Sequence, residues 1–441
     1  MSMSRKLALI PLGILTIIVV LTLIFPSIPA AVYAGPEINS GDTAWMITAT
    51  ALVLFMTPGL AFFYGGMVRK KNVISTMAQS FISMAVITIL WFVVGFSLAF
   101  GDTIGGIIGN PKTFFMMDDI LAHKPWSLAP SIPLVIFAMY QLKFAIITPA
   151  LITGAFAERV KFTSYILFII LWSILIYSPL AHMTWHPDGY FFKKGVLDFA
   201  GGTVVHMSAG WAALASALFF KSRTEGGLEP ARITYVILGT ALLWFGWLGF
   251  NGGSALAANA LAGSALATTT GASAAAAFTW IIFDTVRGRK PSAMGACIGA
   301  VVGLVAITPA AGFVSLTHSL TIGIVSAIIS NLVAEWRNAK TNIDDTLDVF
   351  PCHGVGGMSG MLLTGIFAHK AINTANTTGN GLYFGETNLF FIHLIGIVVV
   401  SIFAFFGTAL LLRIVNLITP MQVSAEEEEA GLDVSQHGER L

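Results

Sequence analysis

The sequence predicts an all-α polytopic membrane protein with eleven transmembrane helices, arranged as an inverted five-plus-five repeat and one extra C-terminal helix. Composition is the first observation behind this prediction. The 441-residue chain is 56% hydrophobic and only 10% charged, against about 25% charged residues in soluble domains, and its mean hydropathy is +0.82. Apolar segments along the whole chain are the second, and most approach the roughly 20 residues that a span needs. They are too long and continuous for barrel strands, so helices are expected.

The first 34 residues differ from the rest of the chain. Arg5 and Lys6 precede an apolar run over 7–25, and small residues close the segment before Gly35. A charged start, an apolar middle and a small-residue end are typical of a cleavable secretory signal. We therefore expect a signal peptide at 1–34. An uncleaved first helix is the alternative, because the apolar run is rather long.

Eleven apolar segments follow within one expected membrane domain, residues 35–419, and a polar cytoplasmic tail follows at 420–441. The eighth and tenth segments are short and glycine-rich, as in discontinuous transporter helices. Alternate loops carry thirteen and five Lys or Arg residues, so the positive-inside rule places the mature N-terminus outside and the C-terminus in the cytoplasm. The segments are 44–67, 77–100, 131–156, 162–182, 199–221, 231–250, 264–285, 292–308, 312–334, 353–369 and 388–417.

Two histidines occupy matching places in the two halves of the chain. His206 lies in the fifth segment and His353 begins the tenth. An aspartate precedes each by eight residues, at Asp198 and Asp345. Because five is an odd number, two blocks of five helices must have opposite orientations. This is the inverted-repeat plan of many transporters, whose site lies at the repeat interface.

An ionisable side chain deep in a bilayer is costly and marks a pathway or a functional site. If His206 and His353 meet in an apolar lumen, their rings share one proton and leave a polar edge free, which suits a small neutral molecule. The alternative is two unrelated histidines, each bound to a backbone carbonyl. No metal site is expected because the spacing with Cys352 matches no zinc pattern. No cofactor or enzyme active site is expected, because GxSxG and HExxH motifs are absent.

Aromatic residues cluster where the expected helices meet the outer face. Trp185, Phe144 and Phe250 are each typical of interfacial anchors when taken singly. Together with the hydroxyl of Ser254, they would form a cation–π cage open to the outside. Asp198 is expected to cap its helix, and its charge can also lower the cost of holding a cation nearby.

Six long motifs resemble the ammonium transporter (Amt/Mep/Rh) family, in the family's order and across nearly the whole mature chain. The resemblance implies an eleven-helix homotrimer with one pore per subunit. The motifs are FFYGGMVRKKNVIS, FAIITPALITGAFAERVKF, AHMTW, LDFAGGTVVHMSAG, WFGWLGFNGGSALAAN and DDTLDVFPCHGVGGMSGMLLTGIF.

Matched by position, the resemblance implies an external recruitment site for ammonium, a phenyl gate beneath it and a twin-histidine pore. The recruitment site includes the acidic residue that recognises the cation, and it also includes nearby backbone carbonyls. The residues are Trp185, Phe144, Ser254, Asp198, Phe199 and Ala200 for recruitment, Phe144 and Phe250 for the gate, and His206, His353 and Trp247 for the pore.

One residue departs from the family pattern. Lys143 precedes Phe144 where an uncharged residue is expected. Neighbours on a helix point about 100° apart, so Lys143 is expected to snorkel outward or to face a subunit contact. If it pointed into the vestibule, it would repel a cation.

The tail carries the acidic run 426–429, which is typical of a solvated surface. The ending GLDVSQHGE is similar to the cytoplasmic tail of prokaryotic ammonium transporters. There the tail contacts neighbouring subunits and helps P-II-type signalling proteins to block the pore. By this resemblance, Gly431, Asp433 and His437 are the regulatory positions.

The expected function is uptake of ammonium across the inner membrane, with ammonia conducted through the pore and the proton following separately or not at all. An ammonium sensor with little flux and an Rh-like channel for ammonia or carbon dioxide are the alternatives. The chain retains both histidines and ends soon after the tail motif, which favours transport. Trp185 and Ser254 argue against a neutral-gas channel, which needs no cation cage. No nucleic-acid partner is expected, since no basic block is present.

Overall fold

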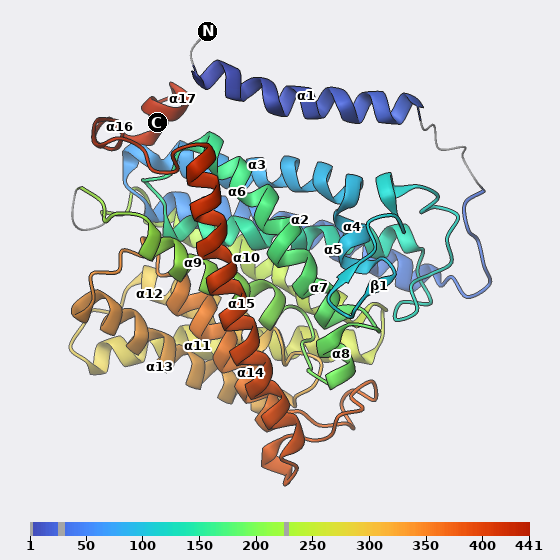
Figure 1. The fold of residues 1–441 in the computed structure, drawn as a ribbon. Helices are drawn as coiled ribbons and strands as arrows, with labels where there is room; N and C mark the ends of the chain where they lie inside the picture. Colours follow the sequence, from blue (N-terminus) through green and yellow to red (C-terminus); the bar gives the residue numbers. More distant parts are fainter. Residues whose placement is uncertain (1–2, 25–30, 225–228) are drawn as a thin grey trace.

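The fold is a bundle of long helices, seen in a computed structural model that describes residues 3–24, 31–224 and 229–441 (Figure 1). Within these residues, nine helical stretches are long and apolar enough to cross a membrane. The predicted all-α membrane class is confirmed. The α-helices of the first half are α1 (Met3–Ile24), α2 (Ser40–Met67), α3 (Val73–Leu90), α4 (Phe96–Phe100), α5 (Leu134–Ile152), α6 (Phe162–Trp172), α7 (Ser178–Trp185), α8 (Tyr190–Lys194) and α9 (Ser208–Phe219).

The second half continues in the same style and ends in two short tail helices. All eleven apolar segments of the sequence fall on helical stretches, and the eighth is short, as expected. Whether all eleven cross the membrane stays a prediction. The elements are α10 (Ile233–Gly252), α11 (Ala260–Val286), α12 (Ala293–Ile307), α13 (Leu316–Lys340), α14 (Gly356–Phe367), α15 (Asn388–Ile418), α16 (Ala425–Ala430) and α17 (Leu432–His437).

In the part of the chain that the structure describes, four π-helical stretches interrupt the α-helices, and the sequence did not predict them. Two join consecutive helices, η2 (Trp91–Gly95) between α3 and α4, and η5 (Ser173–Tyr177) between α6 and α7. The other two, η6 (Gly202–Met207) and η8 (Phe350–Val355), lead into α9 and α14. Such wide turns occur frequently at functional sites. The tenth apolar segment therefore becomes helical three residues before His353.

Two faces of the bundle serve as landmarks. The hairpin face carries the antiparallel strands β1 (Thr103–Ile104) and β2 (Ile108–Gly109), and the tail face carries α16 and α17. Short 3₁₀ turns complete the connections. They are η1 (Lys70–Asn72), η3 (Phe115–Met117), η4 (Thr153–Ala155), η7 (Gly253–Ala255) and η9 (Leu382–Phe384).

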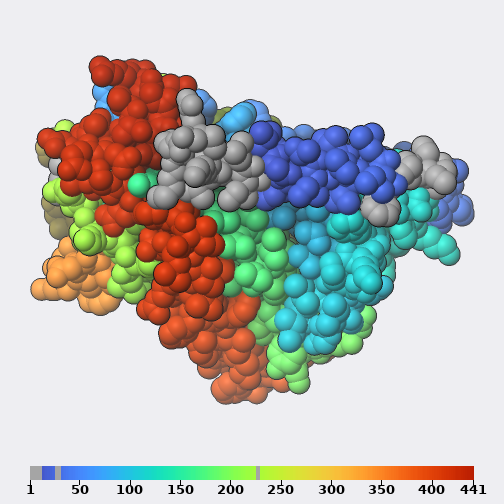
Figure 2. All heavy atoms as spheres, turned by 45° about the horizontal axis from the view of Figure 1, so that its top comes forward, coloured from blue at the N-terminus to red at the C-terminus, as the bar shows by residue number. Residues whose placement is uncertain are grey.

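Helix α1 lies on the outside of the molecule (Figures 1 and 2). Its side chains beyond residue 11 are largely exposed, Leu23 by 75%. An exposed apolar helix agrees both with a removable signal and with a lipid-facing anchor. Residues 1–2 and 25–30 of the predicted signal segment lie outside the described residues, so cleavage at residue 34 stays a prediction.

Glycines allow a close helix pairing between α2 and α10. A Cβ atom on Gly239 would lie 2.3 Å from the backbone nitrogen of Phe63, and one on Gly59 would lie 3.1 Å from that of Leu243. Small residues allow backbones to approach in membranes, where helix association depends on packing rather than on the hydrophobic effect. This pairing fixes α10, which carries Trp247 and Phe250, against the first span.

Candidate functional site

Asp198 caps η6 at the hairpin face. Its Oδ1 atom accepts hydrogen bonds from the amides of Gly201 and Gly202 at 2.7 and 2.6 Å, and its Oδ2 accepts from the amide and hydroxyl of Thr203 at 2.8 and 2.5 Å. The side chain thus satisfies the free N–H groups at the start of the helix. Asp198 therefore caps its helix, as expected. Nothing in the sequence indicated that Thr203 would be one of its partners.

Asp345 caps η8 in the same manner, but near the tail face. Its carboxylate accepts from the amides of Val349 at 3.1 Å and Phe350 at 2.7 Å. Burial raises the pKa of Asp345 to about 6, and the nearby Arg337 opposes this rise. The matched Asp–His spacing therefore reflects two capped helices that start at opposite faces and run toward each other, as an inverted repeat requires.

The two capped helices meet where α9 crosses η8. A Cβ atom on Gly210 would lie 2.1 Å from the backbone nitrogen of Gly354, so only glycine fits there. This close approach brings His206 and His353 together. Their Nδ1 atoms are 3.3 Å apart, and their ring planes differ by 26° at a centroid distance of 5.4 Å. One Nδ1 must carry a proton for the two rings to share a hydrogen bond.

The histidines lie among apolar side chains and beside very little open space. His206 is 1% exposed and His353 is 3% exposed. Two cavities of about 10 Å³ each adjoin them and share Phe63, Val301 and His353. A volume of this size holds about one water molecule. Cavities of this size suit small molecules that pass one at a time, and they are too small for a hydrated ion.

Trp247 lies against the pair on the gate side. Its ring stacks on His206 with centroids 5.2 Å apart and planes at 19°, and its Nε1 atom donates to Thr308 Oγ1 at 2.9 Å. The Nε2 atom of His206 is buried and has no hydrogen-bond partner among the described residues. Leaving a buried ring nitrogen without a hydrogen bond costs free energy. A molecule in the cavity that bonded to this nitrogen would remove that cost.

Phe144 and Phe250 form a stacked pair of rings beside His206, with the ring of Phe250 6.1 Å from that of the histidine. Their rings stack at a centroid distance of 4.1 Å, and both are at most 2% exposed. Trp185 packs edge-on against Phe144 at 5.8 Å. Ser254 donates to the carbonyl of Phe250 at 2.9 Å. The structure thus brings together four residues that the sequence had placed in one cage.

Tyr140 is a fifth member of this group, and the sequence reasoning missed it. It lies one helical turn before Phe144, and its ring meets that of Phe144 at 5.0 Å. Its hydroxyl lies 2.7 Å from the carbonyl of Phe250 and 3.2 Å from Ser254 Oγ. The spacing of four residues from Phe144 was the signal that could have identified it. Tyr140 ties α5 to α10 behind the two stacked rings.

The backbone beside Asp198 is partly engaged within the protein. The Asp198 carbonyl accepts the indole N–H of Trp185 at 3.1 Å, which fixes the orientation of that ring. Phe199 donates its amide to Pro309 and packs edge-on against Phe313, while Ala200 is buried. A recruited cation would therefore share the Asp198 carbonyl with Trp185.

Lys143 is partly buried on α5. It is not among the residues lining the two cavities beside the histidines in the described part of the chain. These cavities are not lined by Phe144 or Trp185, so the direction of Lys143 relative to the vestibule stays a prediction.

The tail positions all contact the tail face. Gly431 has φ of +90°, and a Cβ there would lie 2.6 Å from the backbone oxygen of Lys71. Asp433 Oδ1 accepts from the amide of Ser75 at 2.8 Å, so the tail caps the start of α3. The Nε2 atom of His437 lies 3.2 Å from Ser75 Oγ. The tail is folded onto the bundle rather than free in solution.

Comparisons with known proteins agree over almost the entire chain. Residues 44–440 match the model of the Ammonium Transporter Family. A putative ammonium transporter of Methanothermobacter thermautotrophicus is 45% identical over 403 residues, which cover 91% of this chain and 98% of that protein.

Solved structures show the same fold. The crystal structure of Saccharomyces cerevisiae Mep2 superposes with a TM-score of 0.83 at 35% identity, covering 89% of each chain. A protein described as a sensor Amt protein superposes with a TM-score of 0.82 at 29% identity, covering 90% of this chain and 98% of that one.

Proposed function

Because the chain belongs to the ammonium transporter family, we propose that it recruits ammonium at the aromatic vestibule, removes a proton near the phenyl gate and conducts ammonia past His206 and His353. The proposed vestibule consists of Trp185, Phe144, Ser254, Asp198, Phe199 and Ala200. The observation that carries the proposal is the histidine pair, whose Nδ1 atoms lie 3.3 Å apart beside two cavities of about 10 Å³ each.

Electrostatics favour ammonia over ammonium in such a pore. Moving an ion of this size into a low-dielectric medium costs about 20 kcal/mol before compensation, and a neutral molecule avoids most of that cost. Potassium has the charge and nearly the size of ammonium, but it has no proton to lose. Cation–π contacts of roughly 0.5–2 kcal/mol each concentrate the cation at the vestibule without drawing it through the pore.

The unpaired ring nitrogen supports a direct role for the histidines. The Nε2 atom of His206 lies beside a cavity that also contacts Phe250 and Trp247. Ammonia both donates and accepts hydrogen bonds, so it can satisfy this nitrogen while it passes. The proton either returns to the vestibule or crosses separately through the paired rings, which would give net movement of one charge.

A sensor with little flux is the second candidate, since one structural neighbour is described as a sensor. One cavity borders both histidines, and a second borders His353 but not His206. The second cavity supports conduction, because a receptor that only binds ammonium needs no space beyond His206. An Rh-like channel for neutral gases is disfavoured because it has no use for the ring and hydroxyl groups gathered at the vestibule.

Uptake into liposomes containing the purified full chain tests the proposal. We expect ammonium-dependent uptake that a tenfold excess of potassium does not inhibit, with current recorded on an ammonium pulse if the proton crosses. Uptake without current would exclude net charge movement and leave neutral ammonia conduction. Ammonium binding without uptake above that of empty liposomes would contradict transport and favour the sensor.

Two buried histidines supply a matched pair of variants. His206→Leu removes a pore ring, and we expect uptake to fall at least about tenfold or potassium exclusion to weaken. His393 is equally buried, but its ring bonds only to the backbone, to Leu197 N and Met361 O. His393→Gln is therefore expected to lower stability while potassium exclusion remains. Equal effects on exclusion from both variants would contradict the pore assignment.

We further propose a homotrimer in the inner membrane, with the mature N-terminus outside and the C-terminal tail in the cytoplasm. The excess of Lys and Arg in the loops of the tail face supports this orientation. A P-II-type protein is the proposed partner at the tail face, where Gly431, Asp433 and His437 hold the tail in reach of such a partner.

A further inference from the structure

Arg159 is a fully buried arginine at the tail face, and the transport proposal gives it no role. It is 0% exposed. Its guanidinium group donates to the carbonyls of Ala155 at 2.5 Å, Lys221 at 3.0 Å and Asp344 at 2.7 Å. It also lies 3.1 Å from Thr346 Oγ1 and 3.3 Å from the Asp344 carboxylate. One side chain thereby joins three segments that are far apart in the sequence.

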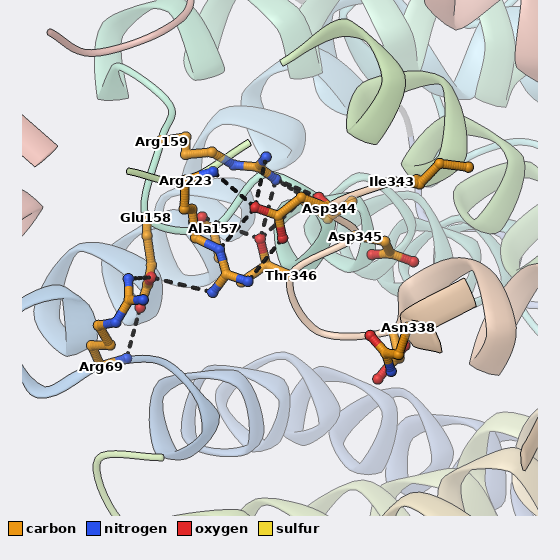
Figure 3. Close-up of polar contacts among 12 residues, drawn as sticks. Arg69, Ala157, Glu158, Arg159, Arg223, Asn338, Ile343, Asp344, Asp345 and Thr346 are labelled. Carbon is orange, nitrogen blue, oxygen red and sulfur yellow. Dashed lines mark hydrogen bonds and ion pairs between the residues drawn. The ribbon is translucent and has the colours of Figure 1, made fainter. Parts of the chain in front are cut away.

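Three of these contacts, with Asp344 and Thr346, are made to one loop, residues 341–349, which leads into η8. Backbone bonds reinforce the same attachment, from Thr346 N to Ala155 O at 3.4 Å and from Leu347 N to Gly154 O at 3.0 Å. Figure 3 shows Arg159 reaching toward Asp344 and Thr346, and Arg223 reaching toward Asp344. The loop is therefore fastened to the end of α5.

A second arginine holds the same loop through charge. Arg223 donates to both carboxylate oxygens of Asp344, at 3.0 and 2.8 Å, and contacts Glu158 at 3.5 Å. Burial would raise the pKa of Asp344, but the hydrogen bonds and positive charge of Arg223 and Arg159 outweigh it and hold the pKa below its ordinary value. Glu158 in turn accepts from Arg69 at 2.8 Å. Paired charges of this kind persist when buried because each is hydrogen-bonded.

The fastened loop sets the start of η8. Asp345 follows Asp344 directly and caps η8 through Val349 and Phe350. His353 lies in the same helical stretch, three residues beyond Phe350. A shift of Asp344 therefore moves the cap, and a shift of the cap rotates or translates the helical turn that carries the ring.

We propose that Arg159 is a positioning residue for His353, acting through Asp344 and Thr346 on the capped start of η8. The proposal rests on the proposed conduction past His206 and His353. Arg159 does not touch the transported molecule. It holds the loop so that the two Nδ1 atoms stay within hydrogen-bond distance, and small displacements at a reacting or selecting centre have large effects on rate.

Two variants of graded severity test this role. Thr346→Val removes one partner of Arg159 and keeps nearly the same side-chain volume. Arg159→Lys keeps the charge but cannot reach the separate partners of the guanidinium group. We expect uptake by reconstituted full-length protein to fall about threefold for Thr346→Val and about tenfold for Arg159→Lys.

A comparison in a second background separates positioning from general damage. In His353→Ala protein, both variants are expected to change uptake less than twofold, because effects that pass through His353 are not additive with its removal. An equal fold-change in both backgrounds would overturn the proposal. An experimental structure of Thr346→Val is the second readout, with the Nδ1 separation expected to exceed 3.3 Å. An unchanged Nδ1 separation would also overturn the proposal. If His353→Ala protein shows no measurable uptake, the Nδ1 separation is the deciding measurement.

Trp172→Phe is the matched control for lost stability. Trp172 is fully buried and its Nε1 donates to Thr408 at 3.0 Å, between α6 and α15. We expect it to lower thermal stability without changing the Nδ1 separation. Failure of the wild-type protein to take up ammonium would contradict the proposed function, whereas the ring separation would still test the positioning by Arg159.

Discussion

At the residue scale, two aspartates perform the same task, which is to cap a helix. Asp198 and Asp345 each lie eight residues before a histidine, and each accepts hydrogen bonds from backbone amides at the start of a π-helical turn. A helix that begins inside a membrane protein leaves N–H groups that no water can satisfy. The carboxylates supply the missing acceptors, which is why the pattern appears at this spacing in both halves.

Asp345 makes stability depend on pH in a direction opposite to most acidic residues. Its pKa is raised to about 6, above the ordinary value of 3.8, so the folded protein binds more protons between these values. Its contribution is fully present below about pH 3.8 and is lost as the pH rises through about 6. Relative to Asp345→Asn, the wild-type protein should gain about 2–3 kcal/mol on acidification from pH 7 to pH 4.

Thermal unfolding of both proteins in detergent across this pH range measures the difference. Asp344→Asn is the matched control, because the pKa of Asp344 is lowered. Its stabilising contribution is present above the ordinary pKa and is lost on acidification, so the sign of its effect should be opposite. Parallel stability curves for wild type and Asp345→Asn would contradict the assignment.

At the element scale, interruptions in the helices matter more than the helices themselves. The turns η6 and η8 start at opposite faces, and α9 crosses η8 where Gly210 meets Gly354. Without this contact the two histidines would not lie 3.3 Å apart. The hydroxyl of Tyr140 fixes α5 to α10 behind the stacked rings of Phe144 and Phe250 in a comparable way. Close approach of elements thus creates the geometry of the histidine pair.

Gly210→Ala tests the crossing. The added methyl would lie 2.1 Å from Gly354 N, and because backbone cannot yield as a side chain does, α9 and η8 must separate. We expect a loss of about 3 kcal/mol of stability together with a large fall in ammonium uptake, measured by thermal unfolding and in liposomes. Gly263→Ala on α11 is the control, since nothing lies within 4 Å of its Cβ position. That variant should be neutral or slightly stabilising, and a similar loss from both would refute the crossing argument.

At the scale of the whole molecule, the tail is bound to the face where η8 begins. Asp433 caps α3 through Ser75, and Glu428 accepts from the amide of Thr224 at 2.7 Å, next to Arg223. Tail, ion pairs and the loop before η8 are therefore contiguous. This continuity gives a physical route from the tail to the loop that precedes His353.

Asp433→Ala should release the tail. The variant leaves the Ser75 amide without its acceptor, and losing a hydrogen bond to a charged group costs about 1–3 kcal/mol. Limited proteolysis of the tail should accelerate roughly five- to a hundredfold, as the population of released tail increases. Glu426→Ala is the control, because Glu426 is exposed on α16. Unchanged proteolysis of Asp433→Ala would show that other contacts hold the tail.

Much of this protein follows from its sequence alone. Hydropathy determined the all-α membrane class and the place of each apolar segment, because a bilayer demands long apolar runs with internally satisfied backbones. Residue pattern and resemblance also identified His206, His353, Phe144, Phe250 and Trp185 as members of one site. The boundaries of η6 and η8 did not follow, since a π-helical turn depends on how neighbouring helices pack rather than on local preference.

Only the tertiary structure decided which groups touch. Tyr140 and Thr308 have no distinctive pattern in an apolar chain, and their hydrogen bonds to Phe250 and Trp247 exist only because distant helices pack together. Arg159 looked like one of several loop cations, counted for orientation alone, yet it is fully buried and joins three segments. Sequence determines what each segment can bury, whereas the partners of buried polar groups are set by contacts between segments remote in the chain, which local composition does not encode.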